Sequence, residues 1–177
     1  MAIMRQIAQM GQPVLRAVAA RIPDPREPVV QSLIEDMLVT VADANGVGIA
    51  APQVFESLAL FIVASNLNPR YPQAPVMEPI AMINPELLWT SDEMIKDWEG
   101  CLSIPGLRGL VPRHTRIGVR YLTRTGEVRE EEFVDFPARI FQHEFDHVRG
   151  VLFIDRIEST LEMVSEKEYL RRMYSHA

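Results

Sequence analysis

One stretch near the C-terminal end has the pattern of a helix with two histidines on one face. Pro137 suits the first helical turn, where its missing N–H is not needed, and Gly150 is a typical stop. His143 and His147 are four positions apart, so on a helix both imidazoles can reach one metal ion. Glu144 falls beside that face and can accept a proton from water bound to the metal. The alternative is an ordinary helix that exposes a His–Glu pair to solvent.

A third ligand must come from elsewhere, because a catalytic metal site generally takes three protein ligands and leaves one position open. Cys101, the single cysteine, is the best candidate, and Gly100 before it lets the backbone bend tightly and expose the sulfur. A thiolate with two imidazoles is a sensible set for a borderline divalent cation. Taken alone, Cys101 reads as a buried, inert thiol; the neighbouring glycine and the histidine pair favour the metal site.

A run of small residues from Gly46 to Gln53 is the third candidate for chemistry. Gly46 and Gly48 suggest a phosphate loop, but the third glycine of the dinucleotide fingerprint is absent and no strand precedes them. Small residues instead let a backbone come close to a ligand, and the Gln53 side chain can donate to a developing oxyanion. The alternative is a simple connection between a helix and a strand.

The hydrophobic pattern predicts an α+β fold. Apolar residues recur at helical spacing from Pro28 until Asn45-Gly46 stops them, and a last helix is predicted from Ser159, with Glu162 completing a capping box. Short apolar runs predict strands over 58–63, 80–83 and 117–122, and the alternating run 128–134 predicts a hairpin with the last of these. Residues 66–79 are predicted to form a long surface loop. Strands framed by helices, without strand–helix alternation, are typical of the α+β class.

Length and charge limit the classes of protein to consider. The 177 residues predict one compact domain, residues 1–177. Lysine and arginine total 18 against 24 acidic residues, so the net charge of −6 excludes a protein that tracks nucleic-acid phosphates, and neither DNA nor a membrane is expected as a partner. No apolar run approaches about 18 residues, and one cysteine cannot close an intrachain disulfide, so a cytoplasmic protein is expected.

Three stretches together resemble the signature set of the peptide deformylases. They are Gly46-Val47-Gly48-Ile49-Ala50-Ala51-Pro52-Gln53, Glu99-Gly100-Cys101-Leu102-Ser103 and Gln142-His143-Glu144-Phe145-Asp146-His147, and they stand in this order. The likeness extends over residues 10–156 and leaves the subtype open. It implies a fold in which a metal-bearing central helix packs among antiparallel strands. It also implies hydrolytic removal of the formyl group from the N-terminal methionine of new polypeptides, with release of formate.

The resemblance also implies a role for each residue of the site. The ligands are expected to be Cys101, His143 and His147; the acid/base Glu144; and the oxyanion donors Gln53 and the Leu102 backbone N–H. Hydroxide attacks the formyl carbon, and the acid/base then returns its proton to the departing amine. The family commonly uses ferrous iron, so Fe²⁺ is expected, with Zn²⁺, Ni²⁺ or Co²⁺ able to occupy the site. Glu99 is expected to pair with Arg113 and hold the cysteine loop.

An apolar pocket is expected to take the methionine side chain. Its predicted lining is Val47, Ile49, Phe136 and Ile140, with core packing as the alternative for each, and Gly46, Gly48 and Gly100 are expected to let the backbone lie close to the substrate. Arg108 is expected to steady the peptide beyond methionine, or else to be a solvated charge. His114 and His176 are assigned to the surface. A basic patch with Arg171 and Arg172 is expected to contact the ribosome transiently, since the substrates are formylated nascent peptides.

Two other functions stay open at this point. A general zinc endopeptidase would often take a later histidine or glutamate as third ligand, and His176 is a poor candidate. A non-catalytic module with a structural metal would usually fill all four positions with cysteine or histidine, and the chain lacks a convincing fourth.

Overall fold

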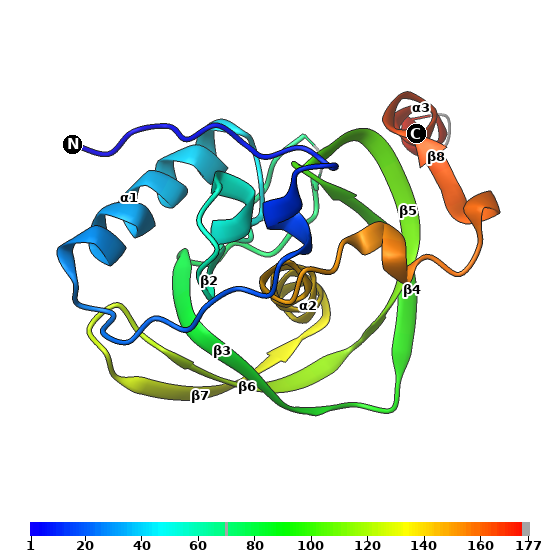
Figure 1. Ribbon diagram of the computed structural model, residues 1–177. Coiled ribbons are helices and arrows are strands. Elements are labelled where there is room, and N and C mark those ends of the chain that lie inside the picture. Colours follow the sequence, from blue (N-terminus) through cyan, green and yellow to red (C-terminus); the bar gives the residue numbers. More distant parts are fainter. Residues whose placement is uncertain (70, 175–177) are drawn as a thin grey trace.

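The computed structural model describes residues 1–69 and 71–174, which form two antiparallel sheets around a central helix (Figure 1). The larger sheet has the strand order β1-β2-β3-β6-β7 and the smaller sheet β4-β5-β8. The strands are β1 (Gly48–Ala50), β2 (Leu60–Val63), β3 (Ile80–Thr90), β4 (Met94–Cys101), β5 (Ile104–His114), β6 (Arg116–Leu122), β7 (Val128–Val134) and β8 (Met163–Ser165). The α-helices are α1 (Pro28–Asp43), α2 (Asp135–Val148) and α3 (Glu166–Tyr174), and the 3-10 turns are η1 (Pro13–Arg16), η2 (Ala51–Val54), η3 (Phe153–Arg156) and η4 (Thr160–Glu162). This architecture confirms the α+β class.

Strand β2 lies between two helices and separates two parts of the core. Leu60 and Ile62 pack in the cluster that includes α1, whereas Phe61 and Val63 pack in the cluster that includes α2. All four side chains are 0% exposed. Successive side chains of a strand point to opposite faces, so a strand covered on both faces reads as an unbroken apolar run. The run over 58–63 in the sequence has this cause.

Helix α2 occupies the middle of the molecule, where Figure 1 shows it end-on. It begins at Asp135 with Pro137 in its first turn, and it ends at Val148, as the sequence predicts. Gly150 follows with a φ of +73°, and an added Cβ there would lie 2.5 Å from the Arg16 carbonyl oxygen. Only glycine fits this close approach in a left-handed conformation, which fixes where the helix stops.

The sequence predicts β2, β6 and β7 closely but underestimates the strands elsewhere. The strand predicted over 80–83 continues to Thr90 as β3, past a bulge at Asn84, whose φ is +50°. The Asn84 amide accepts from the Ile22 N–H at 2.8 Å and donates to the Ile22 carbonyl at 2.9 Å, which stabilises the bulge. Strands β1, β4, β5 and β8 were not predicted.

The helix predicted from Ser159 is wrong in its start and its extent. The Ser159 hydroxyl accepts from the Leu161 N–H at 3.2 Å, but it caps only the short turn η4. Residues 163–165 then form β8, which pairs with residues 107–109 of β5, and α3 begins at Glu166. Pairing with a strand distant in sequence outweighs the local helix signal. Residues 66–69 and 71–79 lie in the connection between β2 and β3, as predicted.

Of the two remaining histidines, His114 differs from the expectation, and His176 cannot be compared with it. His114, assigned to the surface, is half-buried, and its ring Nδ1 lies 2.6 Å from the Ser91 carbonyl oxygen. It belongs to the end of β5, where the two sheets meet. His176 lies outside the described residues.

Candidate active site

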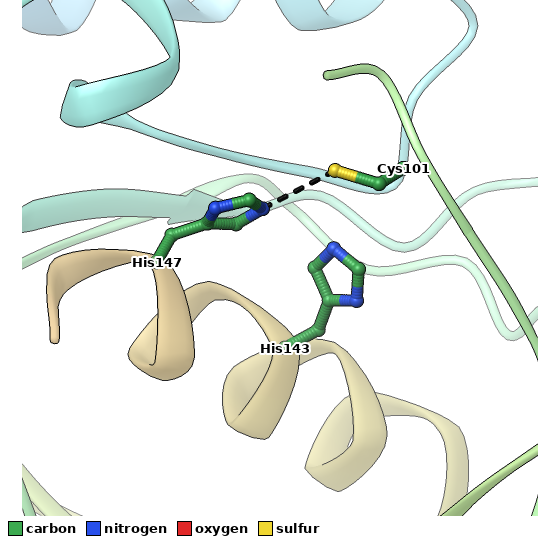
Figure 2. Close-up of side chains that lie close together, drawn as sticks. All are labelled: Cys101, His143 and His147. Carbon is green, nitrogen blue, oxygen red and sulfur yellow. Dashed lines mark hydrogen bonds between the residues drawn. The ribbon is translucent and has the colours of Figure 1, made fainter. Parts of the chain in front are cut away.

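Cys101, at the end of β4, meets both histidines of α2 (Figure 2). One ligand atom from each of the three residues lies within 4.8 Å of the other two. The Cys101 Sγ is 3.3 Å from Nε2 of His147, and the ring centroids of His143 and His147 are 5.1 Å apart. Three converging donors of this chemistry, one thiolate and two imidazoles, fit a first-row divalent cation such as iron or zinc.

His143 is oriented from behind by a carboxylate. Its ring Nδ1 lies 2.9 Å from Oε2 of Glu99, so the other ring nitrogen turns toward Cys101 (Figure 2). Burial disfavours the protonated ring of His143, but hydrogen bonds with Cys101 and Glu99 together have a larger effect and raise the pKa of His143. Burial lowers the pKa of His147. Protons compete with a cation for the imidazole nitrogens, so acidic solution weakens metal binding.

Glu144 is a buried carboxylate that lines the pocket beside Cys101 and His143. Glu144 is 4% exposed, and its Oε2 makes no hydrogen bond with any residue in the described part of the chain. Burial raises the pKa of Glu144 to about 7, against a smaller opposing effect of His143. A carboxyl group with a pKa near neutrality can accept a proton and later return it.

Two glycines make room for these groups. A Cβ on Gly48 would lie 2.5 Å from Oε1 of Glu144, so the missing side chain leaves space for the carboxylate. A Cβ on Gly46 would lie 2.8 Å from Cγ2 of Val41 and 3.3 Å from Cδ1 of Leu102. The small residues expected near the substrate therefore also let β1 approach α2 and the turn between β4 and β5.

Gln53 presents the donor end of its amide to the cysteine. The Ala50 N–H donates to its Oε1 at 2.8 Å, which fixes the plane of the amide. Its Nε2 lies 3.5 Å from the Cys101 Sγ and 3.2 Å from the Ser103 Oγ. An amide N–H₂ held in this position can donate to an oxygen bound beside the sulfur.

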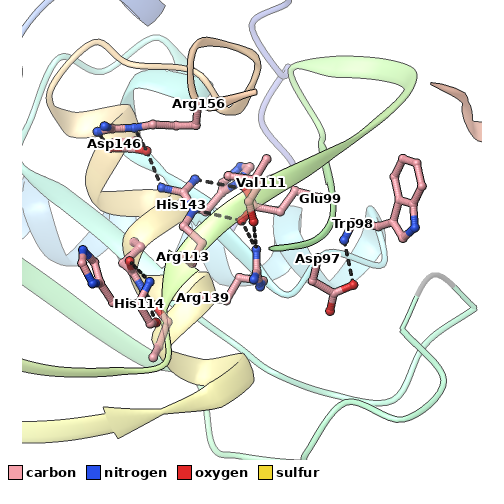
Figure 3. Close-up of polar contacts among 12 residues, drawn as sticks. Asp97, Trp98, Glu99, Val111, Arg113, His114, Arg139, His143, Asp146 and Arg156 are labelled. Carbon is pink, nitrogen blue, oxygen red and sulfur yellow. Dashed lines mark hydrogen bonds and ion pairs between the residues drawn. The ribbon is translucent and has the colours of Figure 1, made fainter. Parts of the chain in front are cut away.

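Five charged residues form a network behind His143 (Figure 3), which we call the buried charge network because all of them except Arg156 are buried: Glu99, Arg113, Arg139, Asp146 and Arg156. Arg113 donates to both oxygens of Glu99, at 2.9 and 3.1 Å, and to Asp146 at 2.6 Å. Arg139 donates to Glu99 at 2.9 Å, and Arg156 to Asp146 at 2.7 Å. Burial of Glu99 disfavours its ionised form, but the charges and hydrogen bonds of Arg113 and His143 together have a larger effect and hold the pKa of Glu99 well below its usual range. The structure thus brings together the expected Glu99–Arg113 pair.

The pocket above the cluster has most of the apolar lining that the sequence predicts. Val47, Phe136 and Ile140 line it, the last two one turn apart on α2. Ile49 does not line it, which corrects the prediction. Side chains alternate along β1, so Ile49 packs in the α1 cluster while Ala50 faces α2.

Gly100 and Arg108 have a shared role that the sequence did not suggest. The β4–β5 pairing shifts register between Glu99 and Cys101, so the backbone is irregular at Gly100, although Gly100 is not in a left-handed conformation. A Cβ on Gly100 would lie 2.9 Å from the guanidinium carbon of Arg108, which crosses β4 at this point. Arg108 is 1% exposed and is bonded to Tyr71 and Glu166, so it is not a solvated charge.

Comparison with known proteins adds to this geometry. The sequence model described as polypeptide deformylase matches residues 4–162. The chain belongs to the polypeptide deformylase family. A relative named peptide deformylase 2, from Nostoc sp. strain PCC 7120, is 58% identical over 163 residues, which cover 92% of this chain and 91% of the relative.

Solved structures of the deformylase family have the same fold. A class I type b peptide deformylase from Acinetobacter baumannii, crystallised with Met-Ala-Ser bound, is 46% identical, with a TM-score of 0.86 over 89% of this chain and 100% of that chain. A peptide deformylase from Thermotoga maritima is 40% identical, with a TM-score of 0.78 over 88% of this chain and 99% of that chain.

Membership of the deformylase family gives the reaction. The chain is a metal-dependent enzyme that removes the formyl group from the N-formylmethionine of nascent peptides. The family favours this reaction over the endopeptidase and the structural metal module. Among residues 1–69 and 71–174, no helix has the length and apolar character needed to cross a membrane.

Several residues of this deformylase site were missed in the sequence. Arg139 stands four positions before His143, so helical spacing could have placed it on the same face of α2. Asp146 lies within the histidine motif itself. Trp98, Tyr71 and Glu166 also line the pocket. Trp98 directly precedes the cysteine motif, whereas Tyr71 and Glu166 are far from the motifs in sequence and no local signal identifies them.

Proposed function

We propose that Cys101, His143 and His147 hold the catalytic cation of this enzyme. The observation that supports the proposal is the convergence of their three donor atoms within 4.8 Å, beside the unpartnered Oε2 of Glu144. A divalent cation bound there lowers the pKa of water and polarises the carbonyl to be attacked. The apolar pocket beside the cluster would take the methionine side chain, with Val47, Phe136 and Ile140 as its lining.

Glu144 is the acid/base in this proposal. Its Oε2 accepts a proton from the attacking water as the water oxygen bonds to the formyl carbon. It returns that proton to the methionine nitrogen as the carbon–nitrogen bond breaks, which yields a free amine and formic acid, and the acid then loses its proton to give formate. Its pKa of about 7 suits both transfers near neutral pH.

Gln53 and the Leu102 N–H are the proposed oxyanion donors. Negative charge gathers on the formyl oxygen as the tetrahedral carbon forms, and donors fixed beforehand stabilise it by about 3–4 kcal/mol each. The bond from Ala50 to Oε1 of Gln53, 2.8 Å long, supplies that fixing. Substitution of Gln53 by Leu should therefore lower kcat more than it raises KM.

Glu144→Gln tests the assignment of the acid/base. The variant keeps the shape of the side chain but not its basicity, so we expect bound metal to be retained while formate release falls by about 10²–10⁴-fold. Glu130→Gln, on the exposed face of β7, is the matched control. A formylated and an acetylated methionyl peptide should both be assayed, since deformylation predicts turnover of the first alone. Unchanged turnover in Glu144→Gln would remove Glu144 from the mechanism.

Ferrous iron is the proposed metal, with Zn²⁺, Ni²⁺ or Co²⁺ able to replace it. A thiolate ligand makes an iron site sensitive to oxidation in air, which gives the proposal a distinct signature. Elemental analysis of protein purified without oxygen, measured together with formate release, tests it. Full activity with zinc alone would contradict the choice of iron.

We also propose that residues 1–177 act as one catalytic domain in the cytoplasm, in passing contact with the ribosome. Arg171 and Arg172 are exposed on α3, and their positive charges would attract the phosphates of ribosomal RNA. The same helix carries Glu166 and Glu168, which limits the strength of the contact. Reversal of both arginine charges should weaken co-sedimentation with ribosomes at low salt without changing turnover of short peptides. Unchanged co-sedimentation would contradict the contact.

A further inference from the structure

On one side of the pocket, the positively charged guanidinium of Arg108 is stacked between the aromatic rings of Tyr71 and Tyr169. The Arg108 guanidinium carbon lies 5.4 Å from the ring centroid of Tyr71 and 5.1 Å from that of Tyr169. Its Nη1 donates to the Tyr71 hydroxyl at 3.1 Å, and its Nη2 to Oε1 of Glu166 at 3.0 Å. We call these four residues, Tyr71, Arg108, Glu166 and Tyr169, the outer wall.

The outer wall is assembled from three segments that are far apart in sequence. Arg108 is on β5, Tyr71 belongs to the loop over 66–79, and the other two residues belong to α3. Pairing of Arg108 with Val164 in the β5–β8 register brings α3 to the pocket, where Figure 1 shows it beside the smaller sheet. The family match ends at residue 162, so Glu166 and Tyr169 lie beyond it.

The charge that a substrate meets on the outer wall is that of the carboxylate. The Arg108 side chain is 2% exposed, whereas the Glu166 side chain is 28% exposed. Glu166 also lines the same pocket as Cys101 and Glu144. Arg108 also lines this pocket, but it is stacked between the rings of Tyr71 and Tyr169 and lies against Gly100, so Glu166 is the more exposed member of the ion pair.

We infer that Glu166 is a specificity-determining residue that disfavours acidic side chains in the few positions after formylmethionine. The inference rests on the proposed function, in which the formyl group lies at the metal cluster. The methionine side chain then occupies the apolar lining, and the rest of the peptide must leave the pocket past its walls. A carboxylate at the edge of that path repels acidic side chains and attracts basic ones, by an amount that solvent keeps small.

The test compares formylated peptides that differ only in one charge. Lysine, alanine or glutamate is placed in turn at the second, third and fourth positions, and kcat/KM is measured for each peptide. Division by the value for the alanine peptide removes effects common to all substrates. We expect Glu166→Gln to lower the lysine-to-glutamate ratio by about threefold at one of these positions, as for a partly exposed charge. The change should shrink as salt rises from about 0.05 M to about 0.5 M.

Glu168→Gln is the matched control, because it removes the same charge from the same helix at a residue that does not line the pocket. It should leave the ratio at its original value. An unchanged ratio in Glu166→Gln, or an equal change in Glu168→Gln, would overturn the inference. Failure of the proposed function is seen separately, as formate release that persists in Glu144→Gln.

Discussion

The two sides of the pocket use charge in different ways. Behind His143, Arg113 pairs with Glu99 and Asp146, and all three side chains are 4–5% exposed. On the outer wall, the side chain of Glu166 is 28% exposed. Removal of one partner from a buried pair leaves an unpaired charge away from water, whereas exposed pairs are weak and screened. The geometry of the reacting groups therefore depends on buried charge, whereas the proposed substrate preference depends on a carboxylate that solvent partly screens.

The largest effect should follow loss of a cation from the buried charge network. Arg113→Met leaves Glu99 and Asp146 without a shared partner, so we expect the free energy of unfolding to fall by about 3–5 kcal/mol. Urea denaturation measures it. Arg116→Met, which removes an exposed partner of Glu132, should cost no more than about 1 kcal/mol. Equal losses in the two variants would remove the distinction between buried and exposed charge.

Gly48→Ala should reduce kcat strongly with little change in stability. The added Cβ would lie 2.5 Å from Oε1 of Glu144, so the carboxylate must move. A misplacement of about 1 Å in a group that transfers a proton costs about 100-fold in rate. Steady-state kinetics and a thermal melt on the same preparation separate the two effects. A variant that keeps its kcat would show that the position of Glu144 is not critical.

Glu99→Gln should weaken metal binding, because an amide orients the ring of His143 less strongly than a carboxylate. We expect a loss of about 10–100-fold in affinity, measured by competition with a chelator. The depressed pKa of Glu99 also predicts a pH effect on stability. Its ionised form stabilises the fold above its unfolded pKa, and this advantage over Glu99→Gln is lost as pH falls through the lower, folded value. A constant difference down to strongly acidic pH would contradict it.

Gly100→Ala should have the smallest effect of the series. The added Cβ would lie 2.9 Å from the guanidinium carbon of Arg108, and the three atoms nearest to it all belong to Arg108 and none to a reacting group. We expect destabilisation at the low end of about 1–3 kcal/mol, with a change in KM rather than in kcat. If kcat fell as far as in Gly48→Ala, the outer wall would contribute to the reaction itself.

The catalytic helix could be predicted because its signals are local. Pro137, Gly150 and the spacing of the histidines all lie within one segment, and α2 follows them. Cys101 could be matched to the histidines because it is the single cysteine, follows Gly100, and offers a thiolate that suits a borderline divalent cation together with two imidazoles. Strands β4 and β5 were missed because glycine, proline and charged residues interrupt any alternation in them.

The rest of the site depends on pairing between distant segments. In the sequence, Arg139 has the pattern of a solvated charge on a helix. Its side chain nevertheless donates to the Val111 carbonyl oxygen of β5 at 2.9 Å and to the Ile95 carbonyl oxygen of β4 at 2.6 Å. Glu166 reaches the pocket only because residues 163–165 join β5 as a strand. The capping signal at Ser159 predicted a helix there, and strand pairing decided otherwise.

X-ray absorption spectroscopy of the metal-loaded enzyme would test the ligand set most directly. One sulfur and two imidazole nitrogens should surround the cation, with the remaining position filled by oxygen from water. A spectrum without sulfur, or with four ligands from the protein and none from water, would contradict the assignment of Cys101, His143 and His147 as a catalytic centre.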